Sequence, residues 1–180
     1  MKVHESSLPG VLIVDLDKFS DDRGFFMETY QRERYREHGI DAEFVQDNFS
    51  RSSRGILRGL HYQIQQPQGK LIQVVSGEIF DVAVDMRRSS ENFGKSVGIH
   101  LSSETAQQVY IPPGFAHGFS VINERADFFY KCTKLYAKEY ERTLLWNDPV
   151  LEIDWPLNDP PLLSEKDQNG LPLNQADCFE

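Results

Sequence analysis

Short apolar segments separated by turn-forming residues recur through the middle of this chain. Each segment is four to eight residues long and rich in Val, Ile or aromatic residues; they cover residues 71–75, 79–85, 97–101, 108–111, 118–122 and 126–133. Repeated short strands with no helix-length segment between them favour an antiparallel sandwich or jelly roll over a parallel α/β sheet. We therefore predict an all-β fold, an antiparallel β-sandwich of the jelly-roll type with a few short peripheral helices.

The two ends of the chain follow other patterns. Residues 11–16 and 25–30 are predicted to be extended, and residues 31–38, rich in Arg and Glu and closed by Gly39, predict a short surface helix. The tail from residue 147 is rich in Pro, Asp and Asn, so we expect irregular chain with one helical turn near residues 164–167. A length of 180 residues suits a single domain, residues 1–180.

Charge and cysteine content exclude several classes of protein. Nineteen Lys and Arg stand against 28 Asp and Glu, a net charge of -9, which disfavours a broad nucleic-acid or anionic membrane surface. The only cysteines, Cys132 and Cys178, have neither disulfide-framework nor zinc-knuckle spacing, which fits a reducing compartment. No signal-like or membrane-length apolar segment is visible. We expect a soluble, cytoplasmic protein.

One stretch reverses the acidic character of the chain. No Asp or Glu occurs between residues 48 and 77. The same stretch carries four cations around His61, namely Arg51, Arg54, Arg58 and Lys70. A local cationic pocket in an acidic protein points to a small bound anion, and a histidine among the cations points to chemistry beside that anion.

Each of these residues also has a purely structural interpretation. His61 lies in a strand-like run and could be a satisfied core histidine. Buried cations could pair with acids elsewhere in the chain, such as Asp81 or Glu141. Tyr130, in an aromatic segment, would ordinarily be a core residue with its hydroxyl at the rim. These alternatives remain open at the level of sequence.

The segment around His61 and a second segment that ends at His117 together resemble half of a cupin metal motif. Residues 112–117, Pro-Pro-Gly-Phe-Ala-His, match its later part, but the early part is broken because Gln63 stands where a second histidine is expected and Lys70 lies near the position of an acidic ligand. Two neutral imidazoles beside an ammonium make a poor metal site. We therefore expect a cupin-type jelly roll that binds no metal.

A histidine base, a lysine and a tyrosine acid can together remove a proton next to a ketone. His61 would take the proton, since an unperturbed imidazole is neutral near pH 7. Lys70 would meet the negative charge that develops on the ketone oxygen. A carboxylate behind His61 would hold its tautomer, but the residues alone do not identify that carboxylate.

Several motifs, in order and over nearly the whole chain, resemble the dTDP-4-dehydrorhamnose 3,5-epimerases of dTDP-L-rhamnose biosynthesis. They are DRGFF at 22–26, FVQDNFS at 44–50, GILRGLHYQ at 55–63, GKL at 69–71, PPGFAHGF at 112–119 and LSEKD at 163–167. The resemblance implies an enzyme without metal or cofactor that inverts carbons 3 and 5 of dTDP-4-dehydro-6-deoxy-D-glucose. The product is dTDP-4-dehydro-L-rhamnose.

The resemblance also implies roles for individual residues. His61 is the base, paired with Asp167; Tyr130 is the acid on the opposite face, and Lys70 steadies the enolate oxygen. Tyr136 is expected to stack on thymine. The remaining expected contacts to the dTDP-sugar are Arg23, Glu28, Gln46, Asn48, Arg58, Lys70, His117, Glu141 and Lys166. Members of the family are typically homodimers with N-terminal segments that cross between subunits, for which residues 11–16 are a candidate.

Three alternatives differ in chemistry. A single-site epimerase would invert only carbon 3 or carbon 5 with a similar set of residues. A metal-dependent cupin oxygenase or isomerase would use His61 and His117 as ligands. A non-catalytic nucleotide-sugar binder would keep affinity for the sugar without proton exchange.

Overall fold

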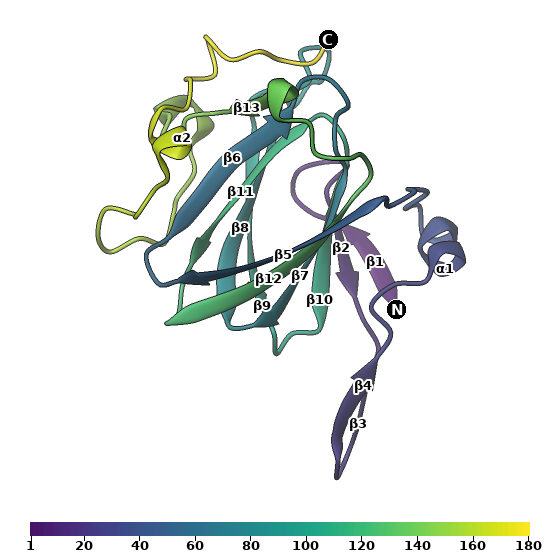
Figure 1. Cartoon of the computed structure of the whole chain (residues 1–180). Coiled ribbons are helices and arrows are strands. Elements are labelled where there is room, and N and C mark those ends of the chain that lie inside the picture. Colours follow the sequence, from purple (N-terminus) through teal and green to yellow (C-terminus); the bar gives the residue numbers. More distant parts are fainter.

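Two antiparallel sheets packed face to face form the body of the molecule in a computed structural model that describes residues 1–180 (Figure 1). The six-stranded sheet contains, in order, β1 (Lys2–Glu5), β2 (Leu12–Asp15), β10 (Gln107–Ile111), β7 (Lys70–Ser76), β12 (Arg125–Cys132) and β5 (Gln46–Ser53). The five-stranded sheet contains β13 (Glu141–Thr143), β6 (Leu57–Gln63), β11 (Phe115–Val121), β8 (Glu78–Asp85) and β9 (Ser96–Ser102). This arrangement confirms the predicted all-β jelly roll.

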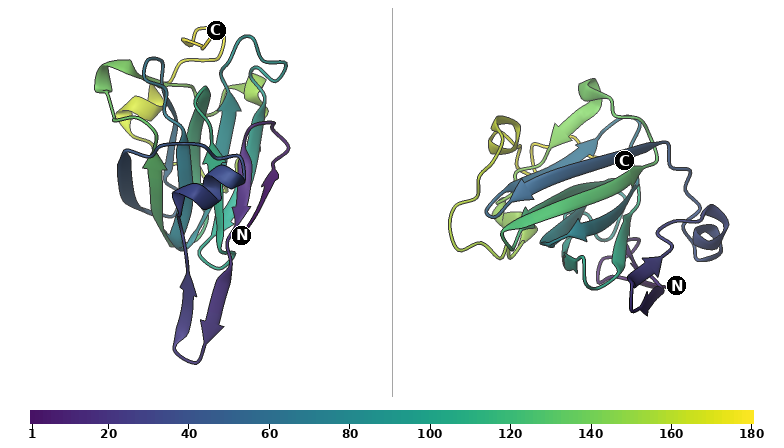
Figure 2. Two further views of the ribbon diagram at one scale, coloured as in Figure 1. Left: turned by 90° about the vertical axis from the view of Figure 1, so that its right-hand side faces the viewer. Right: turned by 60° about the horizontal axis from the view of Figure 1, so that its bottom comes forward.

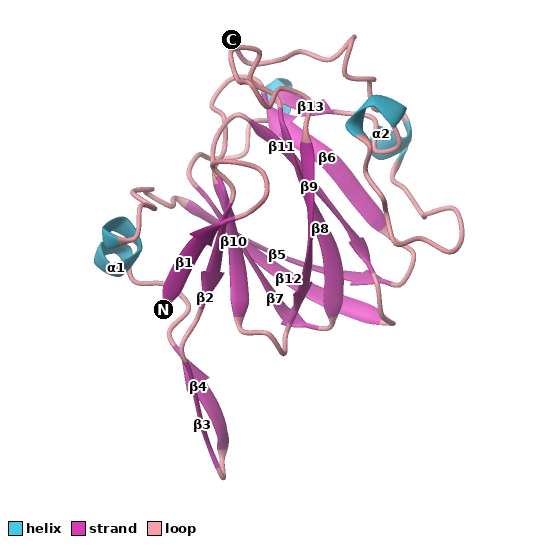
Figure 3. Ribbon diagram, turned by 180° about the vertical axis from the view of Figure 1, so that it is seen from behind, coloured by secondary structure: helices cyan, strands magenta, loops and turns pink.

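The remaining elements lie at the periphery. Strands β3 (Lys18–Asp21) and β4 (Gly24–Met27) pair only with each other, and their hairpin projects from the body (Figures 1 and 2). The helices are short, as predicted: α1 (Arg32–Glu37), α2 (Glu165–Gln168) and the 3-10 turns η1 (Lys138–Tyr140) and η2 (Pro149–Leu151) (Figure 3). None of the helices is long and apolar enough to span a membrane.

Strand β11 lies at the centre of the packing, and all of its residues are buried. Phe115, Phe119 and Val121 face the other sheet and join the main core. Ala116 faces the opposite way, into a second cluster formed with tail residues such as Leu173. The C-terminal tail therefore covers the outer face of the five-stranded sheet, so β11 needs apolar or compact residues on both sides.

The structure differs from the sequence predictions at strand edges. Strand β5 is an edge strand whose residues alternate between exposed and sheltered positions, so it has no apolar run that marks it in the sequence. Strand β11 begins at Phe115, three residues before the predicted segment 118–122, so His117 lies inside the strand and not in the Pro- and Gly-containing turn before it. The corner ends at Gly114, whose φ of 99° suits a residue without a side chain.

Candidate active site

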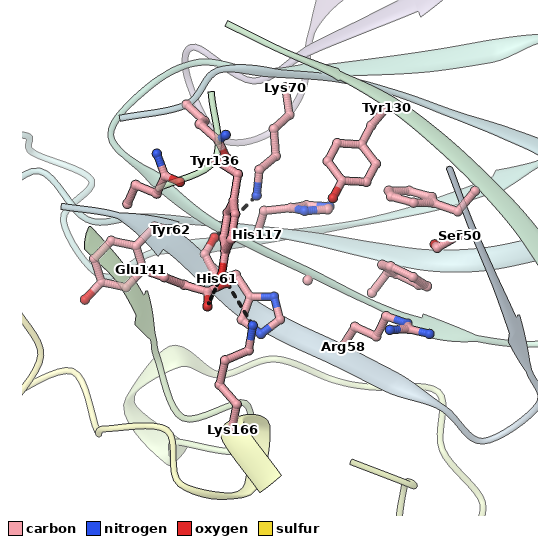
Figure 4. Close-up of a pocket in the computed structure, with 15 residues that line it drawn as sticks. Ser50, Arg58, His61, Tyr62, Lys70, His117, Tyr130, Tyr136, Glu141 and Lys166 are labelled. Atoms are coloured by element: carbon pink, nitrogen blue, oxygen red, sulfur yellow. Dashed lines mark hydrogen bonds and ion pairs between the residues drawn. The ribbon is translucent and has the colours of Figure 1, made fainter. Parts of the chain in front are cut away.

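A cavity of about 310 Å³ opens between the two sheets (Figure 4). Strands β6 and β11 contribute Arg58, His61 and His117 from one sheet, while β7 and β12 contribute Lys70 and Tyr130 from the other. The other residues that line it are Ser50, Tyr62, Gln63, Gln68, Gly118, Phe119, Phe128, Tyr136, Glu141 and Lys166. Most of the predicted site residues therefore meet in one place.

His61 is held by a buried carboxylate. Its Nε2 lies 2.5 Å from Oδ1 of Asp167, which is 2 % exposed and sits on α2 at the other end of the chain. Burial alone would raise the pKa of Asp167, but hydrogen bonds from His61 and Ser164 hold it below its usual value. The carboxylate thus stays ionised and accepts a hydrogen bond from the Nε2–H group, which leaves Nδ1 of the neutral ring as a proton acceptor.

A second histidine lies opposite the first. His117 pairs with His61 across β11 and β6, and its Nε2 lies 2.6 Å from Oδ1 and 3.1 Å from Oδ2 of Asp81. Both side chains are buried, and burial lowers the pKa of His117 although Asp81 opposes this. His117 is therefore a neutral hydrogen-bonding group rather than a fixed cation.

Lys70 is a buried cation without an acidic partner. Its Nζ donates only to the backbone oxygen of His61, at 3.5 Å. Burial lowers the pKa of Lys70, and Asp81 and Glu141 partly counteract this. A buried ammonium with unused donors is suited to bind a negatively charged oxygen.

The proposed ion pairs between these cations and nearby acids do not form. Arg58 donates from Nε to Oγ of Ser52 at 3.0 Å, and like Lys70 it has no carboxylate partner. Asp81 is engaged by His117, and Glu141 by Lys166. Arg58 and Lys70 therefore remain available to a ligand.

The predicted cluster of four cations is wrong in two of its members. Arg51 points away from the cavity and binds Asp127, with Nε 2.6 Å from Oδ1. Arg54 is exposed near the end of β5 and does not line the cavity. The absence of acids in this stretch of sequence did not show which cations share a face, because a turn separates β5 from β6.

Tyr130 lies on the six-stranded sheet and packs against Phe128, with ring centroids 5.2 Å apart. Burial raises its pKa to about 12. The phenol therefore holds its proton at neutral pH and gives it up only to a strong base. Its hydroxyl faces the cavity from the sheet opposite His61 (Figure 4).

The mouth of the cavity carries a small polar network. Lys166 Nζ lies 2.8 Å from Oε1 of Glu141, and the Tyr136 hydroxyl donates to Oε2 of Glu141 at 3.1 Å. Burial would raise the pKa of Glu141, but Lys166 holds it lower. Tyr136 is 51 % exposed, so one aromatic ring is available at the entrance.

Gln46 and Asn48 support this mouth from behind. Gln46 Oε1 accepts from the backbone N–H of Tyr136 at 2.8 Å, and its amide donates to Oδ1 of Asn48 at 3.0 Å. Neither side chain lines the cavity. In this structure they position the loop that carries Tyr136.

Gln63, at the position where a metal ligand was considered, has a structural role. Its Oε1 accepts from the N–H of Ala137 at 2.8 Å, and its amide donates to the backbone oxygens of Gln66 and Leu135. No group of three or more His, Cys, Asp and Glu side chains lies close enough to share one metal ion. The side chain of Gln63 therefore braces the same loop as Gln46.

Like Gln46 and Asn48, two further predicted contact residues lie outside the cavity. Arg23, on the projecting hairpin, is exposed and pairs with Asp21. Glu28 follows the hairpin and pairs with Arg34, with 2.7 Å between Oε1 and Nη1. Within a single chain, neither residue joins the site.

The pairing of Asp81 with His117 was not predicted from the sequence. A signal was present, because Asp81 shares its side of β8 with Ile79 and Ala83, which are both core residues. An acid on the buried side of a strand needs a partner inside the protein. Ser164, which donates to Asp167, had no comparable signal.

Comparisons with known proteins agree on one family. Residues 5–175 match the family described as dTDP-4-dehydrorhamnose 3,5-epimerase. A protein of that name from Pseudomonas aeruginosa is 55% identical over 180 residues, with 99% of each chain covered. Another from Methanothermobacter thermautotrophicus is 47% identical over 97% of this chain and 96% of its own.

Solved structures extend the comparison. The epimerase from Legionella pneumophila, in complex with dTDP-4-keto-L-rhamnose, has a TM-score of 0.95 and 50% identity, covering 98% of this chain and 94% of its own. A 3'-monoepimerase from Streptomyces bikiniensis, in complex with dTDP-quinovose, has a TM-score of 0.89 and 33% identity, covering 95% and 87%.

Proposed function

This chain belongs to the family of dTDP-4-dehydrorhamnose 3,5-epimerases, and we propose that its reaction takes place in the cavity around His61. It is an isomerase that inverts carbons 3 and 5 of dTDP-4-dehydro-6-deoxy-D-glucose to give dTDP-4-dehydro-L-rhamnose. Both carbons are next to the C4 ketone. Each C–H bond is therefore acidified by the same carbonyl group.

The observation that carries this proposal is the placement of an acid and a base on opposite walls. His61 belongs to the five-stranded sheet and Tyr130 to the six-stranded sheet, and both line the same cavity. Inversion at carbon requires that a proton leave one face and another arrive on the other face. A sugar lying between the sheets has one such group on each side.

In the first step His61 removes the proton from the carbon next to the ketone. The electron pair of the C–H bond becomes a carbon–carbon double bond, and the carbonyl electrons move onto oxygen. Lys70 Nζ, which has no acidic partner, donates to this enolate oxygen. Asp167, 2.5 Å from Nε2, stabilises the positive charge that His61 acquires.

In the second step Tyr130 protonates the carbon from the other face. The enolate collapses to the ketone as the phenol gives up its proton. An acid with a pKa near 12 is too weak to act on the ketone but is adequate for an enolate. His61 then releases the abstracted proton to solvent, and Tyr130 regains a proton from solvent.

The mouth of the cavity is suited to the nucleotide part of the substrate. Arg58 and Lys166 supply positive charge for a diphosphate, and His117 supplies a hydrogen-bonding group deeper in the cavity. The exposed ring of Tyr136 offers a stacking surface for thymine. Gln46 and Asn48 contribute by holding this loop.

The active form is proposed to be a cytoplasmic homodimer of single-domain chains. The projecting hairpin exposes three phenylalanines, Phe19, Phe25 and Phe26, beside Arg23. Such an apolar projection is suited to pack on a second copy. Strand β2 is paired on both sides within its own chain, so the hairpin is the better candidate to carry Arg23 and Glu28 to a neighbouring site.

Subunit complementation tests this arrangement. Arg23→Ala and His61→Ala should each have low activity alone. Mixed dimers contain one site in which both residues are intact, so co-refolded variants should regain about one quarter of wild-type activity. If Arg23 acts within its own chain, the mixture stays as inactive as its parents, and light scattering separately reports whether a dimer exists.

Proton NMR in heavy water tests the reaction itself. With dTDP-4-dehydro-6-deoxyglucose and a reductase that traps the product, we expect deuterium at carbons 3 and 5 and formation of L-rhamnose. The likeness to a 3'-monoepimerase favours a second candidate, a single-site epimerase, which would place deuterium at one carbon only. No deuterium in the sugar would contradict both and favour a binder.

The variant Tyr130→Phe distinguishes the role of Tyr130 from that of His61. His61 can still remove a proton and return deuterium to the same face in this variant. Solvent exchange should therefore persist, whereas net inversion should fall by about 100-fold. Equal loss of exchange and inversion would refute the separation of roles.

A further inference from the structure

The two histidine–aspartate pairs differ in what holds the aspartate. Asp81 has His117 as its one side-chain partner. Asp167 accepts on Oδ1 from His61 and on Oδ2 from the hydroxyl of Ser164, at 2.7 Å, and the backbone N–H of Gly59 lies 3.4 Å from Oδ1. Both oxygens of the carboxylate behind the base are therefore occupied.

Ser164 makes this contact from a defined position. It is the N-cap of α2, and its Oγ accepts from the N–H of Asp167 at 3.2 Å while donating to the carboxylate of the same residue. One hydroxyl thus fixes both the backbone and the side chain of Asp167. A helix of four residues has few other bonds to fix its orientation.

The carboxylate has little access to a substitute donor. Asp167 is 2 % exposed, so water cannot readily replace a lost hydrogen bond. Without the hydroxyl, Oδ2 would be a buried acceptor with no partner, and the carboxylate would rotate to share its remaining donors. Rotation moves Oδ1 away from His61 Nε2, and the ring loses the contact that sets its tautomer.

We propose that Ser164 is a positioning residue for catalysis, which holds Asp167 in the orientation that makes His61 a base. This inference rests on the proposed role of His61. Ser164 does not line the cavity, so it acts through Asp167 rather than on the substrate. Its loss should lower kcat and leave KM nearly unchanged, because the other residues that contact the substrate lie outside α2 and Lys166 is held by its ion pair with Glu141.

The experiment compares three substitutions at one position. Ser164→Ala removes both bonds of the hydroxyl. Ser164→Gly also removes both, but glycine is tolerated at an N-cap with only a small loss of helix stability. Ser164→Thr keeps a hydroxyl that can make both bonds. We expect kcat to fall about tenfold in the Ala and Gly variants and to return to within about threefold of wild type in the Thr variant.

Ser90→Ala is the matched control. Its hydroxyl donates to Oδ2 of the buried Asp85 at 2.7 Å, the same bond at a place that does not line the cavity. This variant should keep wild-type kcat. Thermal melting of each variant shows whether a loss of kcat comes from partial unfolding or from a change in the active site.

The outcomes separate this inference from the proposed function. Wild-type kcat in Ser164→Gly, or a loss in Ser164→Thr equal to that in Ser164→Ala, would overturn the positioning role alone. A rise in KM with unchanged kcat would overturn it too, by showing that the residue serves binding. Wild-type protein without proton exchange in heavy water would remove the proposed function, and this inference with it.

Discussion

Replacing Asp167 by asparagine tests the electrostatic role of the carboxylate behind His61. The substitution keeps size and shape but removes the charge 2.5 Å from Nε2. When His61 takes a proton from the sugar, the new positive charge is stabilised by the carboxylate. Taking about 4 Å between the centres of charge of the imidazolium and the carboxylate, and an effective dielectric constant near 20, their attraction is worth about 4 kcal/mol.

An energy of this size corresponds to about a thousandfold in rate, since each 1.36 kcal/mol is a factor of ten. We therefore expect Asp167→Asn to lower kcat about 10³-fold with little change in KM. The assay is deuterium incorporation at both carbons, followed by proton NMR under saturating substrate. Asp85→Asn is the control, because Asp85 is equally buried but lies away from the cavity and should keep wild-type activity per folded molecule.

A loss of less than tenfold in Asp167→Asn would refute this reasoning. It would mean that the charge of Asp167 contributes little in the transition state, and that hydrogen bonding alone orients His61. A thousandfold loss in the control as well would assign the effect to folding. Circular dichroism and thermal melting of both variants distinguish these cases.

Three further predictions follow from single side chains. Lys70→Met should be at least as stable as wild type in urea unfolding, because it removes a buried charge without a carboxylate partner. Its kcat should fall by about 10²-fold or more. Clear destabilisation of the variant would refute the expected gain from removing the charge. Burial would raise the pKa of Asp85, but Arg87 and Ser90 hold it below its usual value. The contribution of Asp85 to stability is therefore present above about pH 4 and is lost as the pH falls through the folded-state pKa. In urea unfolding, the stability of Asp85→Asn should depend less on acid pH than that of wild type, and an identical pH dependence of the two proteins would contradict this. Gly59→Ala should lower the free energy of unfolding in urea by at least about 3 kcal/mol or prevent folding. The new Cβ would lie 2.5 Å from Cα of Gly118, and the backbone φ of 123° is unfavourable for alanine. Wild-type stability would show that the two strands can move apart there.

Most of the strands that the sequence predicted are buried on both faces or alternate between buried and exposed residues, although β4 is exposed along most of its length. Strand β8, for example, has a long apolar run, and its bounds differ from the prediction by one residue at the start. Strand β5 was missed because it lies at a sheet edge, where Asp47, Phe49 and Arg51 are all exposed. Edge strands tolerate polar residues, so their composition resembles that of loops.

The site was predictable where chemistry is local. His61 and Lys70 were assigned from their residue types and surroundings, and both line the cavity. Asp167 was assigned only by resemblance, because it lies 106 residues from His61 and nothing near it in the sequence marks the pairing. Arg51 and Arg54 were misplaced for the related reason that strand register decides which cations share a face.

The contact between His61 and Asp167 also has a consequence for how the protein is made. The base, His61, is synthesised early, but Asp167 and Lys166 follow every strand of both sheets along the chain. A polypeptide that ends between β13 and α2 contains every strand of both sheets but lacks the carboxylate that holds His61. The two sheets therefore cannot form the His61–Asp167 pair by themselves, and such a truncated product should lack catalytic activity.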